Sequence, residues 1–321
     1  MRLRPIAPDE FDEILALHQR SEAFDGIPRV LEMDELELLL DGAQTTMATD
    51  TVAAERDGEI IGYGHTYHLP SDVRLERCYV FGMVDPAHRR QGVGTELLSW
   101  GMDRAVTLLR SSGSSLPKYI RTDRYDFVEG SEHLFIGAGL APVRYHVQMR
   151  RPLDNIPAPS DPDGVKIMGW PSERTAEVRE IKNAAFADHW GSTPTTPQMW
   201  DQIMGEDTTR LDLSFVAVDG SGDIVGYCIN DRYPADDELL ARKEAWIGNL
   251  GTLDAYRGRG IASALMSHSL HAFADEGLTH ACLDVDSDSL TGAHRLYEKL
   301  GFQTKTRTVT YELLLDENPS S

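Results

Sequence analysis

Residues 256–266 read YRGRGIASALM, and residues 88–98 read HRRQGVGTELL. Each stretch places arginine and glycine directly before an apolar run with helical spacing. Gly260 in the first stretch corresponds to Gly92 in the second. Because the same unusual turn occurs twice in matching surroundings, it indicates a device that was duplicated together with the segment around it.

The duplication extends beyond these turns. TVAAERDGEIIGYGHTY at 51–67 corresponds to SFVAVDGSGDIVGYCIN at 214–230, and both predict two strands joined by a glycine-containing turn. ILALHQRSEAF, ending at Phe24, corresponds to VREIKNAAF, ending at Phe186. Between the copies lies PLDNIPAPSDPDG at 152–164, whose proline, Asp and Ser content is typical of a linker. The sequence therefore predicts two domains, residues 1–154 and 155–321.

Each copy predicts a strand, one or two helices, three strands, the glycine-arginine helix, a strand, a helix and a last strand. This order favours an α/β class with a mixed sheet and helices on its faces. In the second copy the predicted strands are 165–168, 213–218, 223–231, 244–253, 281–286 and 306–315. The predicted helices there are 172–186, 261–276 and 292–300.

Composition excludes several classes of protein. The 321 residues carry a formal net charge of -21, which argues against binding nucleic acid or an anionic membrane. The acidity favours either simple solubility or a cationic substrate. No apolar window is long enough to span a membrane. Cys78, Cys228 and Cys282 lack metal-ligand spacing, so we expect reduced, buried thiols in a cytoplasmic protein that holds no metal.

Each glycine-arginine turn predicts an anion cradle. A helix start exposes unpaired backbone N–H groups and the positive end of the helix dipole. Glycine lets a phosphate approach the backbone, and arginine adds charged hydrogen bonds. The spacing matches neither G-x-G-x-x-G nor the Walker loop. The alternative is a plain helix-entry turn with solvated arginines.

The spacing [R/Q]-x-x-G-x-[G/A] after a strand resembles the GNAT N-acetyltransferase superfamily. A third element, LDVDSDSLTGAHRLYEKLGF at 283–302, resembles that family's closing segment, with Ser289 where the family usually has Asn. The resemblance covers nearly the whole chain. It implies two tandem GNAT acyl-CoA N-acyltransferase domains that use acetyl-CoA as cosubstrate and transfer the acetyl group directly in a ternary complex.

The resemblance also implies which residues bind the cofactor. They belong to the strand end and the turn that follows it, together with the closing segment. In the second copy they are Leu250, Gly251, Thr252, Arg257, Gly258, Arg259, Gly260, Ile261, Ala262, Ser263 and Ser289; in the first they are Gly82, Met83, Val84, Arg89, Arg90, Gln91, Gly92, Val93, Gly94 and Thr95.

Catalytic roles follow from the same resemblance. Tyr297 matches the tyrosine that protonates the departing thiolate, although a packed helix aromatic is the alternative interpretation. In the first copy Phe135 falls at that position and has no proton to give. We expect this copy to be catalytically degenerate, whether or not it binds acetyl-CoA. Glu244 is the candidate base, with a surface strand end as its alternative. Asp284 and Asp286 share one face of the neighbouring strand and are further candidates.

FADHWGSTPTTPQMW at 186–200 lies where this family carries its acceptor-binding segment. Asp188, His189 and Trp190 are therefore candidate substrate-binding residues, and a loop packed on the core is the alternative. We expect an N-acetyltransferase acting on a small-molecule amine such as an amino-sugar, antibiotic or amino acid, as a monomer or homodimer. A non-catalytic acyl-CoA sensor and a protein lysine or N-terminal acetyltransferase are the competing interpretations.

Overall fold

The computed structural model describes residues 1–42, 44–71, 73–187, 192–287 and 293–315. It divides into two compact units. The N-terminal unit comprises Met1–Tyr145 and Thr308–Ser321, and the C-terminal unit comprises His146–Arg307. These units are defined by contacts in the structure, whereas the boundary near residue 155 was predicted for the two sequence copies and stays a prediction.

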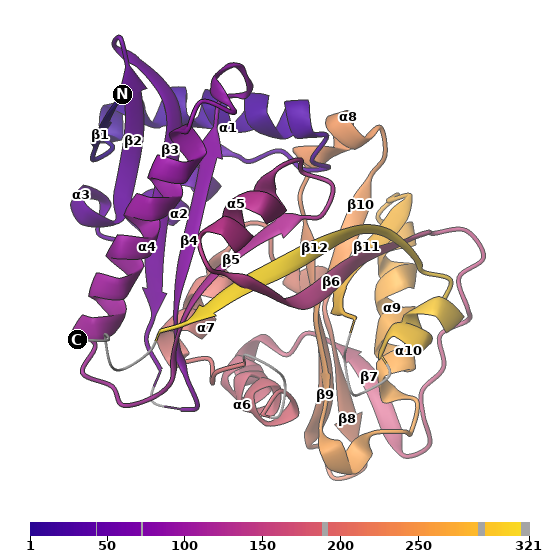
Figure 1. Ribbon diagram of the computed structural model, residues 1–321. Helices are drawn as coiled ribbons and strands as arrows, with labels where there is room; N and C mark the ends of the chain where they lie inside the picture. Colours follow the sequence, from indigo (N-terminus) through magenta and orange to yellow (C-terminus); the bar gives the residue numbers. More distant parts are fainter. Residues whose placement is uncertain (43, 72, 188–191, 288–292, 316–321) are drawn as a thin grey trace. The chain divides into compact units, whose positions relative to one another are not determined.

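The elements follow the predicted order with two differences: the first copy has a third helix at 47–50, and the second copy has a short helix at 236–240 between two of its predicted consecutive strands (Figure 1). The first copy contains β1 (Arg2–Arg4), α1 (Phe11–Asp25), α2 (Met33–Asp41), α3 (Met47–Asp50), β2 (Thr51–Arg56), β3 (Glu59–Leu69), β4 (Glu76–Val84), α4 (Val93–Ser111), β5 (Lys118–Tyr125), α5 (Ser131–Gly137) and β6 (Ala141–Pro152). The second contains β7 (Val165–Gly169), α6 (Thr175–Ala185), α7 (Pro197–Gly205), β8 (Phe215–Asp219), β9 (Ile224–Arg232), α8 (Asp236–Leu240), β10 (Glu244–Thr252), α9 (Ile261–Asp275), β11 (His280–Asp286), α10 (Ala293–Lys299) and β12 (Gln303–Leu314). Short 3-10 turns η1 (Pro8–Glu10), η2 (Pro86–His88), η3 (Ser172–Arg174), η4 (Leu211–Leu213) and η5 (Asp254–Tyr256) complete the described elements.

The sheet in each unit is mixed, as predicted. In the N-terminal unit the strand order is β1-β2-β3-β4-β5, and residues 308–314 of β12 pair with β5. In the C-terminal unit residues 146–152 of β6 pair with β11, followed by β10, β9, β8 and β7. The last strand of each copy thus joins the sheet of the other copy's unit. The pattern of apolar residues could not reveal this exchange, because it shows that a strand is buried but not which neighbour it pairs with.

One parallel pair interrupts each otherwise antiparallel sheet. β4 pairs with β5 from Glu76 to Tyr79, and β10 pairs with β11 from Glu244 to Ile247. β4 then continues to Val84 and β10 to Thr252, beyond the range of the parallel pairing. The strands of each pair therefore separate, which opens a cleft at the C-terminal ends of β4 and β10.

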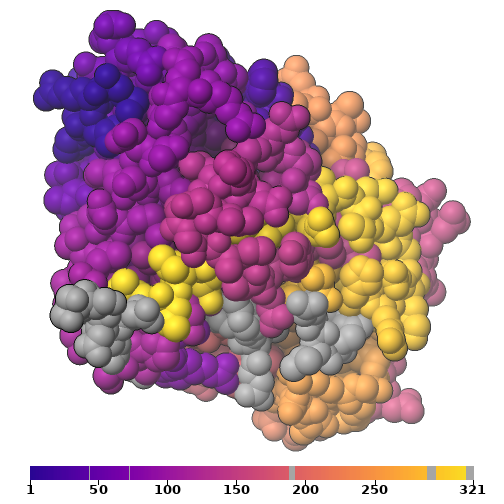
Figure 2. All heavy atoms as spheres, in the orientation of Figure 1, coloured from indigo at the N-terminus to yellow at the C-terminus, as the bar shows by residue number. Residues whose placement is uncertain are grey.

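Two helices pack on opposite faces of each unit's sheet at this point. In the C-terminal unit Tyr227 and Ile229 belong to a buried cluster with Val178 of α6. Cys228, which lies between them on β9, belongs to the cluster that contains Leu265 of α9. Side chains fill the spaces between the ribbons of each unit (Figure 2). The alternation of β9 places one face toward α6 and the other toward α9.

Candidate active site

The second cradle, Arg257–Ser263, lies between η5 and the first turn of α9. Gly260 is the N-cap of α9, with φ of 81°. A φ in this range favours glycine, because glycine has no Cβ. No heavy atom lies within 4 Å of the place where a Cβ would stand. The first backbone bond of the helix runs from Ala264 N to Gly260 O. The N–H groups of the first turn therefore face open space at the positive end of the helix dipole.

The first cradle, Arg89–Thr95, repeats this geometry. Gly92 caps α4 with φ of 84°, and the space beside it is also open to 4 Å. Glu96 N donates the first backbone bond of the helix to Gly92 O. Arg90 has φ of 60°, which is uncommon for a residue with a side chain. Both turns thus offer a backbone surface shaped for an anion.

Arg89 and Arg257 brace their turns by binding the protein itself. Arg257 donates from Nη2 to the Ala185 carbonyl at 2.9 Å. Arg89 forms a two-pronged ion pair with Asp25, at 2.6 and 3.0 Å. Each arginine therefore ties its cradle to the C-terminal end of the first helix in its copy. Arg259 lies over the Tyr256 ring, with Cζ 5.1 Å from the ring centroid.

Arg89→Ala should lower the free energy of unfolding by about 2 kcal/mol, because the buried Asp25 carboxylate would lose its two-pronged partner. Arg257→Ala is the matched variant, and we expect it to cost less than about 1 kcal/mol because its ionic partner Asp254 is exposed. Denaturant unfolding of both variants measures the difference. Equal losses would show that the ion pair with Asp25 does not stabilise the N-terminal unit.

The second cleft brings together most of the cofactor-binding residues predicted for the C-terminal copy. The strand end, the second cradle and α10 all contribute to its wall. β10 carries a bulge between Ile247 and Asn249, beside the strand end. A bulge leaves backbone N–H groups outside the regular ladder. The residues that line the second cleft include Gly248, Leu250, Gly251, Thr252, Arg257, Gly258, Gly260, Ile261, Ala262, Ser263, Asp284, Asp286 and Tyr297.

Tyr297 lies in this second cleft, on α10. Its side chain is 9% exposed and packs edge-on against Phe302, with ring centroids 6.3 Å apart. Burial raises the pKa of Tyr297 to about 12. The phenol therefore stays protonated at neutral pH and can donate a proton. Tyr297 is thus packed against its neighbours and also forms part of the cleft wall, and its role as a proton donor stays a prediction.

The first cleft is lined by the corresponding elements of the N-terminal unit. Gly82, Met83, Val84, Arg89, Arg90, Gly92, Gly94 and Thr95 all contribute to its wall. Phe135 of α5 lies where Tyr297 lies in the other unit, and its ring packs against Tyr311 at 5.0 Å. The structure thus places the predicted pair of aromatic residues at equivalent positions.

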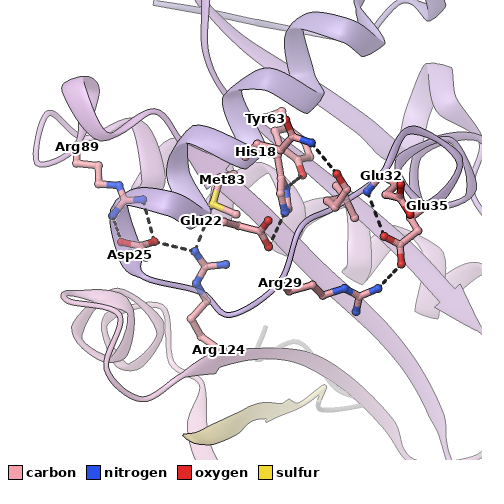
Figure 3. Close-up of polar contacts among 12 residues, drawn as sticks. His18, Glu22, Asp25, Arg29, Glu32, Glu35, Tyr63, Met83, Arg89 and Arg124 are labelled. Carbon is pink, nitrogen blue, oxygen red and sulfur yellow. Dashed lines mark hydrogen bonds and ion pairs between the residues drawn. The ribbon is translucent and has the colours of Figure 1, made fainter. Parts of the chain in front are cut away.

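An ion-pair network crosses the first cleft (Figure 3). Arg124 of β5 donates from Nη2 to the Met83 sulfur of β4 at 3.2 Å and to Asp25 at 3.3 Å. Arg89 binds the same carboxylate. Met83 corresponds to Gly251 in the C-terminal unit, where the Tyr227 ring occupies the place of a Cβ. In the N-terminal unit Arg124 and Met83 therefore bridge the diverging strands β4 and β5.

The carboxylates predicted as candidate bases lie in two different places. Asp284 and Asp286 line the second cleft, as does His146, which the sequence did not single out. Glu244 is buried at the other end of β10, about 20 Å along the strand from Leu250. It accepts a hydrogen bond from Arg242 Nε at 2.6 Å and lies 3.8 Å from Arg150. Glu244 is thus an ion-paired group outside the lining of the cleft.

Asp188, His189, Trp190 and Ser289 lie outside the described residues. Within the described ranges, no group of three histidine, cysteine or acidic side chains is arranged to hold a metal ion. The described helices include none that is long and apolar enough to cross a membrane. All three cysteines are buried and free.

Comparison with known proteins identifies the fold. The model of the "Acetyltransferase (GNAT) family" matches residues 13–112 and again 175–302. A mycothiol acetyltransferase of Streptomyces coelicolor is 28% identical over 312 residues, which cover 96% of this chain and 93% of the relative. The tandem plan inferred from the sequence looks like that of mycothiol synthase, and these matches confirm that similarity.

Two solved structures share the architecture along nearly the whole chain. A GCN5-related N-acetyltransferase from Sphaerobacter thermophilus aligns with a TM-score of 0.75 and 27% identity, covering 98% of this chain and 95% of that chain. A tandem GNAT protein from the clavulanic acid biosynthesis pathway aligns with a TM-score of 0.70 and 17% identity, covering 100% and 99%. The predicted fold class is confirmed.

Proposed function

Because the chain belongs to the acetyltransferase (GNAT) family, we propose that its C-terminal unit transfers an acetyl group from acetyl-CoA to the primary amine of a small molecule. Enzymes of this family use acetyl-CoA as the donor. The observation that carries the proposal is the position of Tyr297 in the second cleft, together with the open second cradle and the Leu250–Thr252 end of β10, which is called the thioester strand below. The N-terminal unit has Phe135 at that position.

The residues of the second cleft fit both the pyrophosphate and the thioester of acetyl-CoA. The backbone N–H groups of the second cradle would bind the pyrophosphate, since the space beside Gly260 is open and the helix dipole favours an anion. The N–H groups of the β10 end would hold the thioester carbonyl, whose oxygen gains negative charge during attack. Tyr297 would protonate the departing sulfur. Acetyl-CoA supplies the activated acyl group when bound.

A thiol-release assay with acetyl-CoA tests this function. The acceptors are glucosamine, an aminoglycoside, lysine amide and a lysine-containing peptide. We expect amine-dependent release of CoA with at least one of the small acceptors. Release only with the peptide would indicate a protein acetyltransferase. Tight acetyl-CoA binding with no release on any acceptor would indicate a sensor, and would overturn the proposal.

The two units should respond differently to the same substitution. Gly92→Glu places a carboxylate in the first cradle, where it repels an anion, yet we expect turnover to stay within about threefold of wild type. The reason is that the N-terminal unit lacks the tyrosine and its cleft is crossed by Arg124. Thiol release by a variant that is still folded at the assay temperature measures this. Complete loss of turnover would assign the chemistry to the N-terminal unit.

A further inference from the structure

A carboxylate lies beside the bulge of β10, on the sheet face that α6 covers. Asp231 of β9 and Trp246 of β10 are cross-strand partners, directly next to the register shift at Gly248. Ile229 and Tyr227, two and four residues before Asp231, pack into the cluster under α6. Strand alternation therefore directs Asp231 to the same face.

Gly248 connects this carboxylate to the second cleft. Gly248 lines the cleft, whereas Asp231 lies directly behind it, where a methyl group on Gly248 would overlap the Asp231 carboxylate. The absence of a side chain at the bulge thus lets the carboxylate approach the backbone of the thioester strand. Asp231 is the acidic group that the structure places at this point of the strand, whereas Glu244 lies at the strand's far end.

The surroundings of Asp231 suit a cationic amine. The Trp246 ring packs edge-on against Tyr233, with ring centroids 6.3 Å apart. An ammonium group is attracted both to the face of an aromatic ring and to a carboxylate. The Trp246 indole N–H is buried, and no acceptor lies within hydrogen-bond distance of it in the described structure. Burial raises the pKa of Asp231 to about 6, although a hydrogen bond from Thr209 acts in the opposite direction and lowers this pKa.

The N-terminal unit provides an internal comparison. Gly62 to Leu69 of β3 pair one for one with β4, and Tyr67 pairs with Tyr79. This pair occupies the place of Asp231 and Trp246, counted from the matching partners Gly62–Val84 and Gly226–Thr252. The two tyrosine rings stack at 5.1 Å. The unit that lacks the catalytic tyrosine thus also lacks the carboxylate.

We propose that Asp231 binds the ammonium group of the acceptor beside the thioester strand and takes its proton, an assignment that rests on the proposed acetyltransferase function. Asp231 would then perform the role that the sequence suggested for Glu244. The acceptor class is a primary amine that is charged in solution, so a neutral hydroxyl analogue would lose the ion pair.

The proton and electron pairs balance in this step. One ammonium N–H bond breaks and its proton passes to the Asp231 carboxylate, which frees the nitrogen lone pair. The C–N bond then forms as the C–S bond breaks, and Tyr297 gives its proton to the sulfur. The nitrogen loses a second proton to solvent as the amide forms, and solvent returns one to Tyr297. Asp231 releases its own proton to water before the next cycle.

Asp231→Asn, which keeps the shape and removes the charge, tests the assignment. We expect kcat/KM to fall by about 10- to 100-fold, because a hydrogen bond to a charged group is lost. Asp275→Asn is the matched control, because Asp275 is an exposed carboxylate at the end of α9, outside the lining of the cleft, and we expect a change below about twofold. Gly248→Ala should reproduce the Asp231→Asn loss, because the methyl group displaces the carboxylate without removing it.

Binding provides a readout apart from turnover. In the presence of CoA, calorimetry compares glucosamine with glucose, and 6-aminohexanamide with 6-hydroxyhexanamide. Wild type should prefer the amine of at least one pair, and Asp231→Asn should remove that preference while CoA affinity and melting temperature stay unchanged. If wild type acetylates an amine and Asp231→Asn matches it within threefold, the assignment of Asp231 is overturned and the proposed function stands. If wild type acetylates no amine of the panel, the proposed function is overturned, and with it the assignment of Asp231.

Discussion

Replacing Tyr297 with phenylalanine should lower kcat by about 10²-fold and leave acetyl-CoA affinity nearly unchanged. General acid catalysis contributes about 10²- to 10⁴-fold, and water in the cleft can replace part of the hydroxyl's contribution. The hydroxyl acts mainly as negative charge develops on sulfur, so its loss affects the transition state more than the bound substrates. Steady-state thiol release, combined with calorimetry of acetyl-CoA binding, separates the two quantities.

The reciprocal variant is the control for this prediction. Phe135→Tyr gives the N-terminal unit the missing phenol, but we expect no gain in turnover because Arg124 and Met83 still meet across its cleft. The Tyr297→Phe defect should also shrink with an acyl donor whose leaving group needs no proton. Full turnover by Tyr297→Phe under conditions where chemistry is rate-limiting would leave Tyr297 as a packing residue and remove the reason for calling the N-terminal unit degenerate.

Gly260→Glu should weaken acetyl-CoA binding by at least about 10²-fold. A carboxylate would stand in the open space at the start of α9, where it blocks the phosphate sterically and repels it. The backbone adds a smaller cost, because φ of 81° disfavours a residue with a Cβ by about 1 kcal/mol. Calorimetric titration with acetyl-CoA measures the loss.

Gly277→Glu separates these two causes. Gly277 follows the same helix at its other end, with φ of 76° and no heavy atom within 4 Å of a Cβ. It carries the same added charge and similar backbone strain, but it is not part of the cradle. We expect a lower melting temperature with acetyl-CoA affinity unchanged. Equal losses of affinity in both variants would attribute the effect of Gly260→Glu to unfolding.

Much of the fold could be predicted because its signals are local. The predicted strand at 244–253 and helix at 261–276 are confirmed as Glu244–Thr252 and Ile261–Asp275. Apolar spacing sets the type of each element, and glycine marks the turn between them. The repeat added what one copy could not provide, since the second occurrence of the turn made the family resemblance specific. The predicted tandem GNAT fold is confirmed by the two family matches.

The site was harder to predict where its geometry depends on distant contacts. The role of Arg89 as a phosphate ligand stays a prediction, and the structure adds what the sequence did not reveal, an ion pair with Asp25 at the end of α1. Asp231 gave no signal, because its relation to the cleft depends on a bulge in the neighbouring strand at Gly248. A glycine inside a predicted strand indicates a bulge or a close approach, so Gly248 was the clue that the sequence did contain.

The most direct test of the account is thiol release by Gly92→Glu and Gly260→Glu, measured side by side with the same amine. Both variants add one carboxylate at the start of a helix, at φ of 84° and 81°, so strain and charge are matched between the units. The account predicts that Gly92→Glu keeps most of the wild-type turnover and that Gly260→Glu loses nearly all of it. The reverse pattern, in folded variants with normal melting, would contradict the assignment of the chemistry to the C-terminal unit.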